Sequence, residues 1–147
     1  MDSKSKVYFH FDNTRVTLRD RLKLKRAIEG LFKKEKVDLL SLSYIFCSDE
    51  VLLGINRKFL QHDYYTDIVT FNYSNHKSPV TGEAYISVTR VRENALTLKT
   101  SITEELLRVV FHGALHLCGY NDKSAKGKAE MRKKENFYLS RMNKRST

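Results

Sequence analysis

Cysteine, proline and long apolar runs are scarce in this 147-residue chain. Its two cysteines, Cys47 and Cys118, lie far apart and form no CxxC pair, which excludes a zinc ribbon and a disulfide framework. One proline and no Pro/Ser-rich stretch leave no linker, so we expect a single domain over residues 1–147. No apolar run approaches the roughly 20 residues of a membrane span, and none resembles a secretory signal, so we expect a cytoplasmic protein without membrane contact.

The residues that are plentiful describe a folded domain. Hydrophobic residues make up 41% of the chain and aromatic residues 11%, which excludes intrinsic disorder. A chain of this length removes ~68–70% of its unfolded surface from water when it folds. Its core therefore needs no structural metal, and any bound metal ion serves function.

The positive charge is concentrated at the two ends of the chain. The formal net charge is +10. Residues 15–36 hold nine basic and three acidic side chains, and residues 123–147 hold nine and two, whereas residues 37–122 hold seven and ten. A single lysine or arginine can belong to an ordinary solvated helix face. Two basic ends together predict a polyanionic partner, and nucleic acid is the expected one.

The spacing of apolar residues predicts elements in the order βαβαββααα. Strands are expected at residues 7–11, 39–47, 66–71 and 84–88. Helices are expected at residues 18–36, 49–59 after a Ser48 cap, 90–98, 102–118 after a Ser101 capping box, and 125–142. Strands mixed with helices favour an α+β fold, with a small mixed four-stranded sheet covered by about five helices.

Two histidines, His112 and His116, lie four residues apart in the fourth predicted helix, among apolar residues. At this spacing two side chains share one helix face with Cβ atoms ~5–6 Å apart, so both imidazoles can reach one divalent cation. In the alternative interpretation both are core histidines hydrogen-bonded to the backbone or to a carboxylate. The H-E-x-x-H metalloproteases have a general-base glutamate after the first histidine, and Gly113 stands there instead, so this is not that protease motif.

A third ligand is expected from the segment after Gly119, which ends the helix. Asp122 is the first candidate, six residues after His116 and ten after His112. Two imidazoles and one carboxylate form a known type of catalytic zinc site that leaves one position for water. Asp122 could instead be a turn or cap residue, because aspartate is favoured in both places.

Residues 112–120, H-G-A-L-H-L-C-G-Y, resemble the signature H-G-x-L-H-L-x-G-Y of the YbeY family. That signature continues to a third histidine six residues after the second, and Asp122 occupies this position here. Residues 56–71 look like the family's N-x-x-Y-R-x-x-D-x-x-T-D-V-L-S-F block, and residues 82–87 look like its G-D-I-x-I-S strand. The resemblance spans residues 56–122, and Leu60 stands where the family has its arginine.

The YbeY family consists of bacterial metal-dependent single-strand endoribonucleases implicated in ribosomal RNA maturation and small-subunit quality control. The resemblance implies this function here, with ribosomal RNA and the small ribosomal subunit as partners. It implies one divalent ion, most simply Zn²⁺, and no small-molecule cofactor. His112, His116 and Asp122 would be the ligands and catalytic residues, since an ion held there lowers the pKa of water towards ~7 or polarises a phosphate oxygen.

Further residues are expected to support this chemistry. Asp67, Thr70 and Ser87 are candidates for supporting the ligands or contacting the substrate, or else they are ordinary polar residues near strand ends and turns. The expected RNA contacts are Lys23, Arg26, Lys33, Lys34, Arg132 and Lys133. Leu60 and the missing third histidine favour, as the alternative, a non-catalytic RNA-binding factor of ribosome assembly. A metal-dependent hydrolase of another bond is less favoured because it gives the +10 charge no role.

Overall fold

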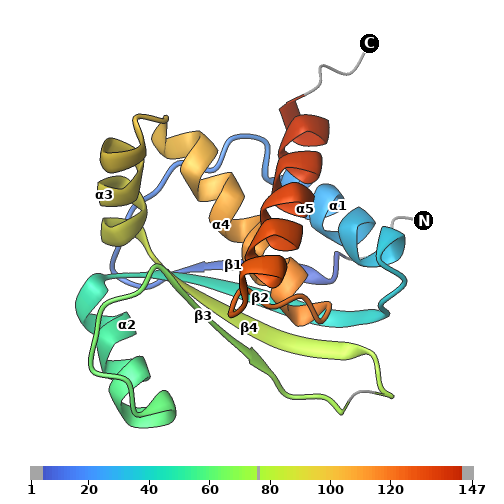
Figure 1. Cartoon of the computed structure of the whole chain (residues 1–147), viewed down its shortest axis with the longest axis horizontal. Coiled ribbons are helices and arrows are strands. Elements are labelled where there is room, and N and C mark those ends of the chain that lie inside the picture. Colours follow the sequence, from blue (N-terminus) through green and yellow to red (C-terminus); the bar gives the residue numbers. More distant parts are fainter. Residues whose placement is uncertain (1–4, 76, 144–147) are drawn as a thin grey trace.

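A four-stranded mixed sheet forms the centre of the protein in the computed structural model, which describes residues 5–75 and 77–143 (Figure 1). Its strands are β1 (Val7–Phe11), β2 (Leu39–Cys47), β3 (Ile68–Asn72) and β4 (Val80–Ser87). They lie in the spatial order β1-β2-β4-β3. β2 is parallel to both β1 and β4, whereas β3 joins the edge of β4 antiparallel. The expected α+β class and mixed sheet are confirmed.

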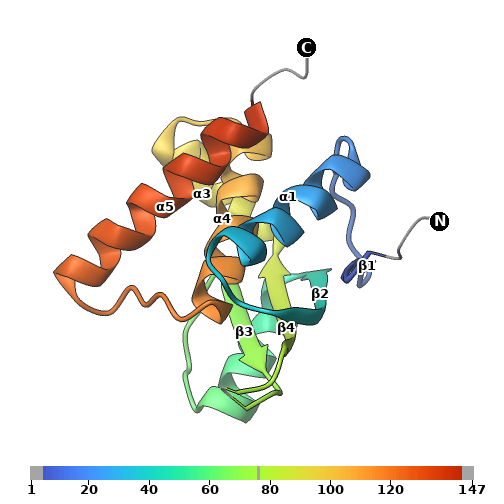
Figure 2. The same cartoon turned by 90° about the vertical axis from the view of Figure 1, so that its right-hand side faces the viewer.

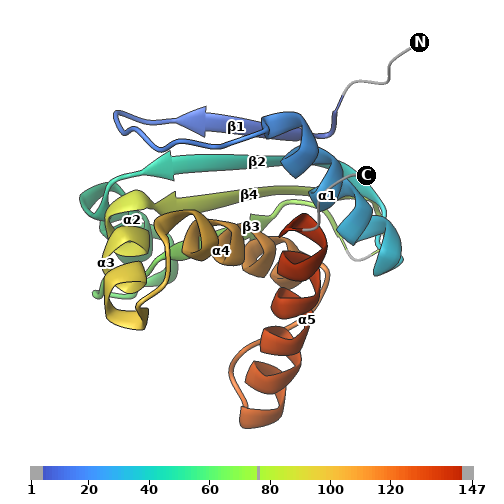
Figure 3. The same ribbon diagram turned by 90° about the horizontal axis from the view of Figure 1, so that it is seen from above.

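The helices cover the two faces of this sheet unequally. They are α1 (Arg21–Lys34), α2 (Asp49–Ile55), which continues into the π-helical turn η1 (Asn56–Leu60), α3 (Val88–Leu98), α4 (Ile102–Leu117) and α5 (Ala125–Asn143). Figure 2 shows α1, α4 and α5 on one side of the sheet and α2 on the other. The view from above separates the four strands and places α4 in front of β4 and β3 (Figure 3). The predicted order βαβαββααα is confirmed.

Alternation along the strands divides the apolar residues between two clusters. In β2, Leu42, Tyr44 and Phe46 are fully buried in the main core with α1 and α4. A smaller cluster joins Cys47 and Val69 to α2 on the opposite face. Helices therefore cover both faces of the sheet at β3 and β4. The face that is turned towards α4 is part of the main core.

Several predicted boundaries are wrong; β3, for example, begins at Ile68 rather than at residue 66. Two of these errors arise because a side chain caps the backbone at a different residue. α1 begins at Arg21 rather than at residue 18, since Asp20 accepts a hydrogen bond from the backbone N–H of Lys23. Val88 begins α3 instead of ending a strand, because Ser87 caps that helix. β4 starts at Val80, before the expected residue 84, because it pairs along the whole of β2.

Both cysteines are free thiols, as expected. Cys47 is buried and Cys118 is half-buried, and burial raises the pKa of each thiol to about 12. These thiols are therefore protonated and unreactive at neutral pH. No helix within residues 5–75 and 77–143 combines the length and the apolar character needed to span a membrane.

Candidate metal centre

Helix α4 carries both predicted histidines on the side that is turned away from the main core. Ser101 caps its first turn, where its Oγ accepts the backbone N–H of Glu104 at 3.0 Å. Beside the histidines the helix packs so closely on β3 that a Cβ at Gly113 would lie 2.7 Å from Cδ1 of Ile68. This contact explains why glycine stands at the position where the H-E-x-x-H proteases have glutamate. A glutamate at position 113 would collide with Ile68.

His112 lies between two carboxylates. Its Nδ1 is 2.7 Å from Oε2 of Glu135 in α5, and its Nε2 is 3.3 Å from Oδ2 of Asp122. Glu135 is buried, and its other oxygen accepts a hydrogen bond from Arg108 at 3.1 Å. A carboxylate on the rear nitrogen of a histidine fixes the ring and its tautomer, which is the arrangement found behind many metal-bound imidazoles. The same contact also matches the alternative in which His112 simply bonds to a carboxylate.

Asp122 reaches His112 because the chain reverses sharply at the end of α4. Gly119 has a φ of +108°, and the N–H groups of Gly119 and Tyr120 donate to the carbonyls of His116 and Leu115. This pair of bonds is a Schellman motif, which requires a left-handed residue and explains why glycine ends the helix. Ser124 caps α5 by accepting the N–H of Gly127 at 2.9 Å. Asp122 is therefore not the cap of α5.

His116 is the most exposed of the three predicted ligands. Its ring is nearly parallel to that of His112, with centroids 6.5 Å apart. Both rings and Asp122 line a cavity of about 370 Å³ between α4, β3 and η1, here called the α4–η1 cavity. Within the described ranges no three His, Cys, Asp or Glu side chains are already grouped closely enough to hold one ion. The structure thus joins two predicted ligands in direct contact and places the third beside the same cavity.

A second cavity, of about 340 Å³, lies on the other side of His112 and is called here the α4–α5 cavity. Burial raises the pKa of Asp67 there, and burial followed by the charge of Asp67 raises the pKa of Glu105. Burial alone would lower the pKa of His112, but Glu135, Asp122 and Asp67 together raise it. Carboxylates that disfavour one another's charge are stabilised by a nearby cation.

The chain is similar to known proteins in both sequence and structure. The model of the family "Endoribonuclease YbeY" matches residues 9–143. The chain belongs to the YbeY family. An "Endoribonuclease YbeY" from Cytophaga hutchinsonii is 47% identical over 91% of the chain and 94% of that protein. Another from Amoebophilus asiaticus is 39% identical over 92% of each. A solution structure from Thermotoga maritima covers 92% of the chain and 88% of its own, with a TM-score of 0.63 and 28% identity.

The three residues predicted to support the YbeY site lie in different places. Asp67 lines the α4–α5 cavity, and its Oδ2 is 3.4 Å from Nδ2 of Asn94. Thr70 lines the α4–η1 cavity. Ser87 is fully buried at the start of α3, where its hydroxyl donates to Asp49 at 2.7 Å. Asp67 and Thr70 are therefore placed near the histidines, and Ser87 is occupied in capping a helix.

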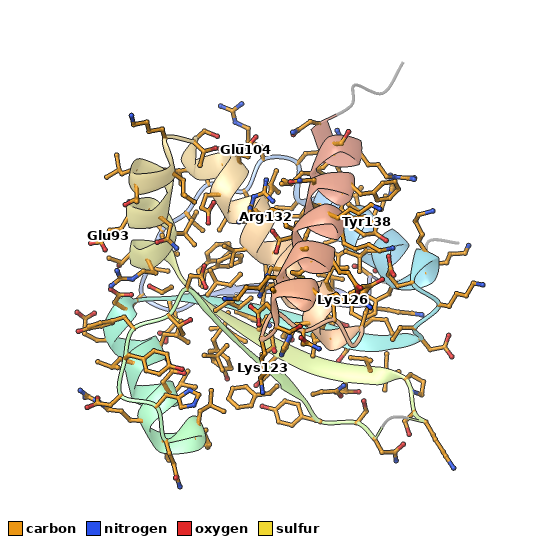
Figure 4. All side chains as sticks on the ribbon, in the orientation of Figure 1. Glu93, Glu104, Lys123, Lys126, Arg132 and Tyr138 are labelled. Carbon is orange, nitrogen blue, oxygen red and sulfur yellow. The ribbon has the colours of Figure 1, made fainter. Side chains whose placement is uncertain are left out.

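The predicted RNA-binding residues occupy two separate regions of the surface. Lys23, Arg26 and Lys34 of α1 line a groove of about 300 Å³ against α5, together with Arg141. Arg132 lies between α4 and α5 and lines the α4–α5 cavity (Figure 4). Lys33 and Lys133 are exposed. Basic side chains thus stand both beside the histidines and along the groove between the two terminal helices.

A buried carboxylate ties these regions together. Glu35, directly after α1, accepts hydrogen bonds from the hydroxyls of Tyr120 at 2.6 Å and Tyr138 at 2.5 Å, and from Nζ of Lys134 at 3.2 Å. Burial alone would raise the pKa of Glu35, but these three donors outweigh it and hold the pKa of this carboxyl below its ordinary value. Glu35 therefore connects α1, the turn after α4, and α5.

The sequence reasoning missed Glu135 and Arg108. A signal for Glu135 was available, because it follows the helical spacing of Met131 and Tyr138. The structure buries all three residues. A carboxylate on the apolar face of a helix needs a partner, and it therefore marks a site. Arg108 lies one turn before His112 on α4, so it shares a helix face with that histidine.

Proposed function

We propose that this chain is a metal-dependent endoribonuclease that cleaves single-stranded segments of ribosomal RNA. Its place would be in the maturation and quality control of the small ribosomal subunit, in the cytoplasm. The observation that carries the proposal is the pairing of His112 with Asp122, beside His116, on one cavity wall with a buried Glu135 behind it. Membership of a family whose relatives are named endoribonucleases supports the reaction class.

His112, His116 and Asp122 would hold the ion, and their chemistry suits one. Glu135 occupies Nδ1 of His112, so Nε2, which faces Asp122, is the nitrogen left for a metal. Two imidazoles and a carboxylate are a ligand set for Zn²⁺, and they bind other divalent ions as well. An ion in this position supplies Lewis acidity for a phosphate oxygen and for water. These residues suit a metal ion because of their donor atoms and because Glu135 orients His112. His116 would supply its nitrogen from the same cavity wall.

The other residues around the site would bind and orient the RNA backbone. Arg108, Lys128 and Arg132 line the α4–α5 cavity, and Lys123 lines the α4–η1 cavity. Such cations bind phosphates on either side of the cleaved bond, and they supply most of the affinity for nucleic acid. Among the described residues that line the α4–η1 cavity, Lys123 is the one Lys or Arg, and Leu60 lies in the same wall. Lys123 would therefore bind phosphate where the family's arginine is absent.

Metal content and RNA cleavage test this function together. The purified chain is expected to contain about one divalent ion, measured by elemental analysis, and to cleave single-stranded RNA until a chelator is added. His112→Ala and His116→Ala should lose both the ion and cleavage. His10→Ala is the matched control, because His10 is an exposed histidine on β1. Unchanged metal content and unchanged cleavage in the two α4 variants would reject the proposal.

A non-catalytic RNA-binding factor is the second candidate. The observations that favour it are Leu60 in the cavity wall and three ligand side chains that do not already converge. This candidate predicts salt-sensitive binding of small-subunit RNA that survives chelation, without cleavage. The groove lined by Lys23, Arg26 and Lys34 would then carry the binding, and charge reversal there would abolish it.

A further inference from the structure

The exposed rings of His62 and Tyr64 form a part of the α4–η1 cavity wall that contains none of the proposed metal ligands. His62 and Tyr64 stack with centroids 5.0 Å apart and planes inclined by 19°, and the Tyr64 hydroxyl lies 3.0 Å from Nδ1 of His62. We call this pair the His62–Tyr64 platform. Tyr64 is 56% exposed although it lines the cavity, so much of its surface is open to a ligand.

One buried residue, Asn56, anchors the backbone of the platform. Asn56, which is 1% exposed, donates from its Nδ2 to the backbone carbonyl of Tyr64 at 3.1 Å. The backbone carbonyl of Asn56 accepts the backbone N–H of His62 at 2.9 Å. Gln61, between them, takes a left-handed conformation with φ 56° that turns the chain. The backbone of both ring-bearing residues is thus fixed to η1, which reduces the conformational entropy that is lost when a ligand binds.

The surroundings of the platform define the ligand chemistry. Leu60 and Ile68 add apolar wall, Lys123 adds a cation, and His116 lies in the same cavity. An aromatic face, an apolar wall and a nearby cation match a nucleobase attached to a phosphate, because bases stack on aromatic side chains while basic groups bind the backbone. The volume of about 370 Å³ lies within the ~300–1,000 Å³ range of ligand pockets.

We propose that the His62–Tyr64 platform binds one unpaired base of the RNA, next to the phosphodiester that faces His112, His116 and Asp122. This inference rests on the proposed nuclease function and adds a reason for strand selectivity. A base inside a duplex is covered on both faces by its neighbours and cannot stack on the platform without leaving the helix. Single-stranded RNA can place a base there at no such cost.

A thermodynamic cycle between the platform and a single base tests this inference. The full chain is titrated with single-stranded RNA oligonucleotides, with EDTA present so that the RNA stays whole. An abasic nucleotide is placed at each position in turn. One position is expected to weaken binding roughly tenfold, the loss that corresponds to one stacked base. Tyr64→Ala should weaken binding of the intact RNA by a similar factor, and the abasic change should then have no further effect.

Three variants separate stacking from other causes. Tyr64→Phe keeps the ring and should retain most of the affinity, whereas His62→Ala removes the stacked partner and should lose part of it. Tyr8→Ala is the matched control, since Tyr8 is an exposed tyrosine on β1, at the other edge of the sheet from β3. Thermal unfolding verifies that each variant is folded, which is expected because His62 and Tyr64 are exposed.

The outcomes distinguish this inference from the function on which it rests. Additive losses from the abasic nucleotide and from Tyr64→Ala would overturn the base-binding site, even if the chain cleaves RNA. An equal loss in Tyr8→Ala would also overturn it. A strong coupling in a chain that never cleaves RNA would support the base-binding site and reject the nuclease.

Discussion

The close contact between α4 and β3 at Gly113 gives a quantitative prediction. An alanine Cβ at this position meets Cδ1 of Ile68 at 2.7 Å, whereas its next neighbours, in Thr70 and Ala84, lie at ordinary contact distances of 3.6 and 3.7 Å. Overpacking of this kind costs ~1–3 kcal/mol. Replacing a helical glycine by alanine gains about 1 kcal/mol. Gly113→Ala should therefore lower the free energy of unfolding by about 0–2 kcal/mol.

The same substitution should have the opposite sign once the obstructing atom is removed. Ile68→Val deletes Cδ1 and alone costs ~0.5–1.5 kcal/mol. In that background Gly113→Ala meets only ordinary contacts and should stabilise the protein by about 1 kcal/mol. The coupling between the two positions is then about 1–3 kcal/mol, well above the ~0.3–0.5 kcal/mol scatter of independent sites.

Urea unfolding of the four proteins, followed by circular dichroism, measures this cycle. The slope with urea should stay constant, so that midpoints report stability. Gly30→Ala in α1 is the control, because nothing lies within 4 Å of a Cβ there, and it should stabilise both backgrounds equally. If Gly113→Ala changes stability by the same amount with Ile68 and with valine, the steric explanation of Gly113 is wrong.

Substitutions at three other positions test separate contacts. Tyr44→Phe removes the buried hydroxyl that donates to the Val110 carbonyl at 2.8 Å and should cost about 1 kcal/mol in urea unfolding. Ser101→Ala removes the cap on the Glu104 N–H and should cost about 1 kcal/mol, while Ser101→Asp should not. Glu35→Gln should cost about 1–3 kcal/mol at pH 7. Because the pKa of Glu35 is lowered by folding, this cost should shrink as the pH falls below about 4.3 through that lowered pKa, as stability measured against pH will show.

The sequence was sufficient for the element order because each element carries its own periodicity. The β2 alternation and the apolar spacing of α4 both appear in the structure as expected. Boundaries were less predictable where two signals competed. Val88 is β-branched and follows a strand, yet Ser87 caps the next turn and makes it helical. At Asp20, a residue with positive φ sets the start of α1, and apolar spacing alone does not reveal it.

The spacing of residues alone was enough to group the candidate ligands only where they are close in sequence. His112, His116 and Asp122 lie within one helix and its following turn, so spacing was enough to group them. Glu135 comes from another helix, and its contact with His112 depends on how α5 crosses α4. The two cavities likewise join β3 and η1 to α4, and no single segment contains that information.

The hydrogen bonds that Glu35 accepts have a mechanical consequence for a protein that binds RNA. They fasten the two positively charged end segments to each other and to Tyr120, two residues before Asp122. RNA bound in the groove between α1 and α5, if it moved these segments, would also move the turn that carries Asp122, the proposed third ligand. RNA binding in the groove and the position of Asp122 relative to His112 would then change together.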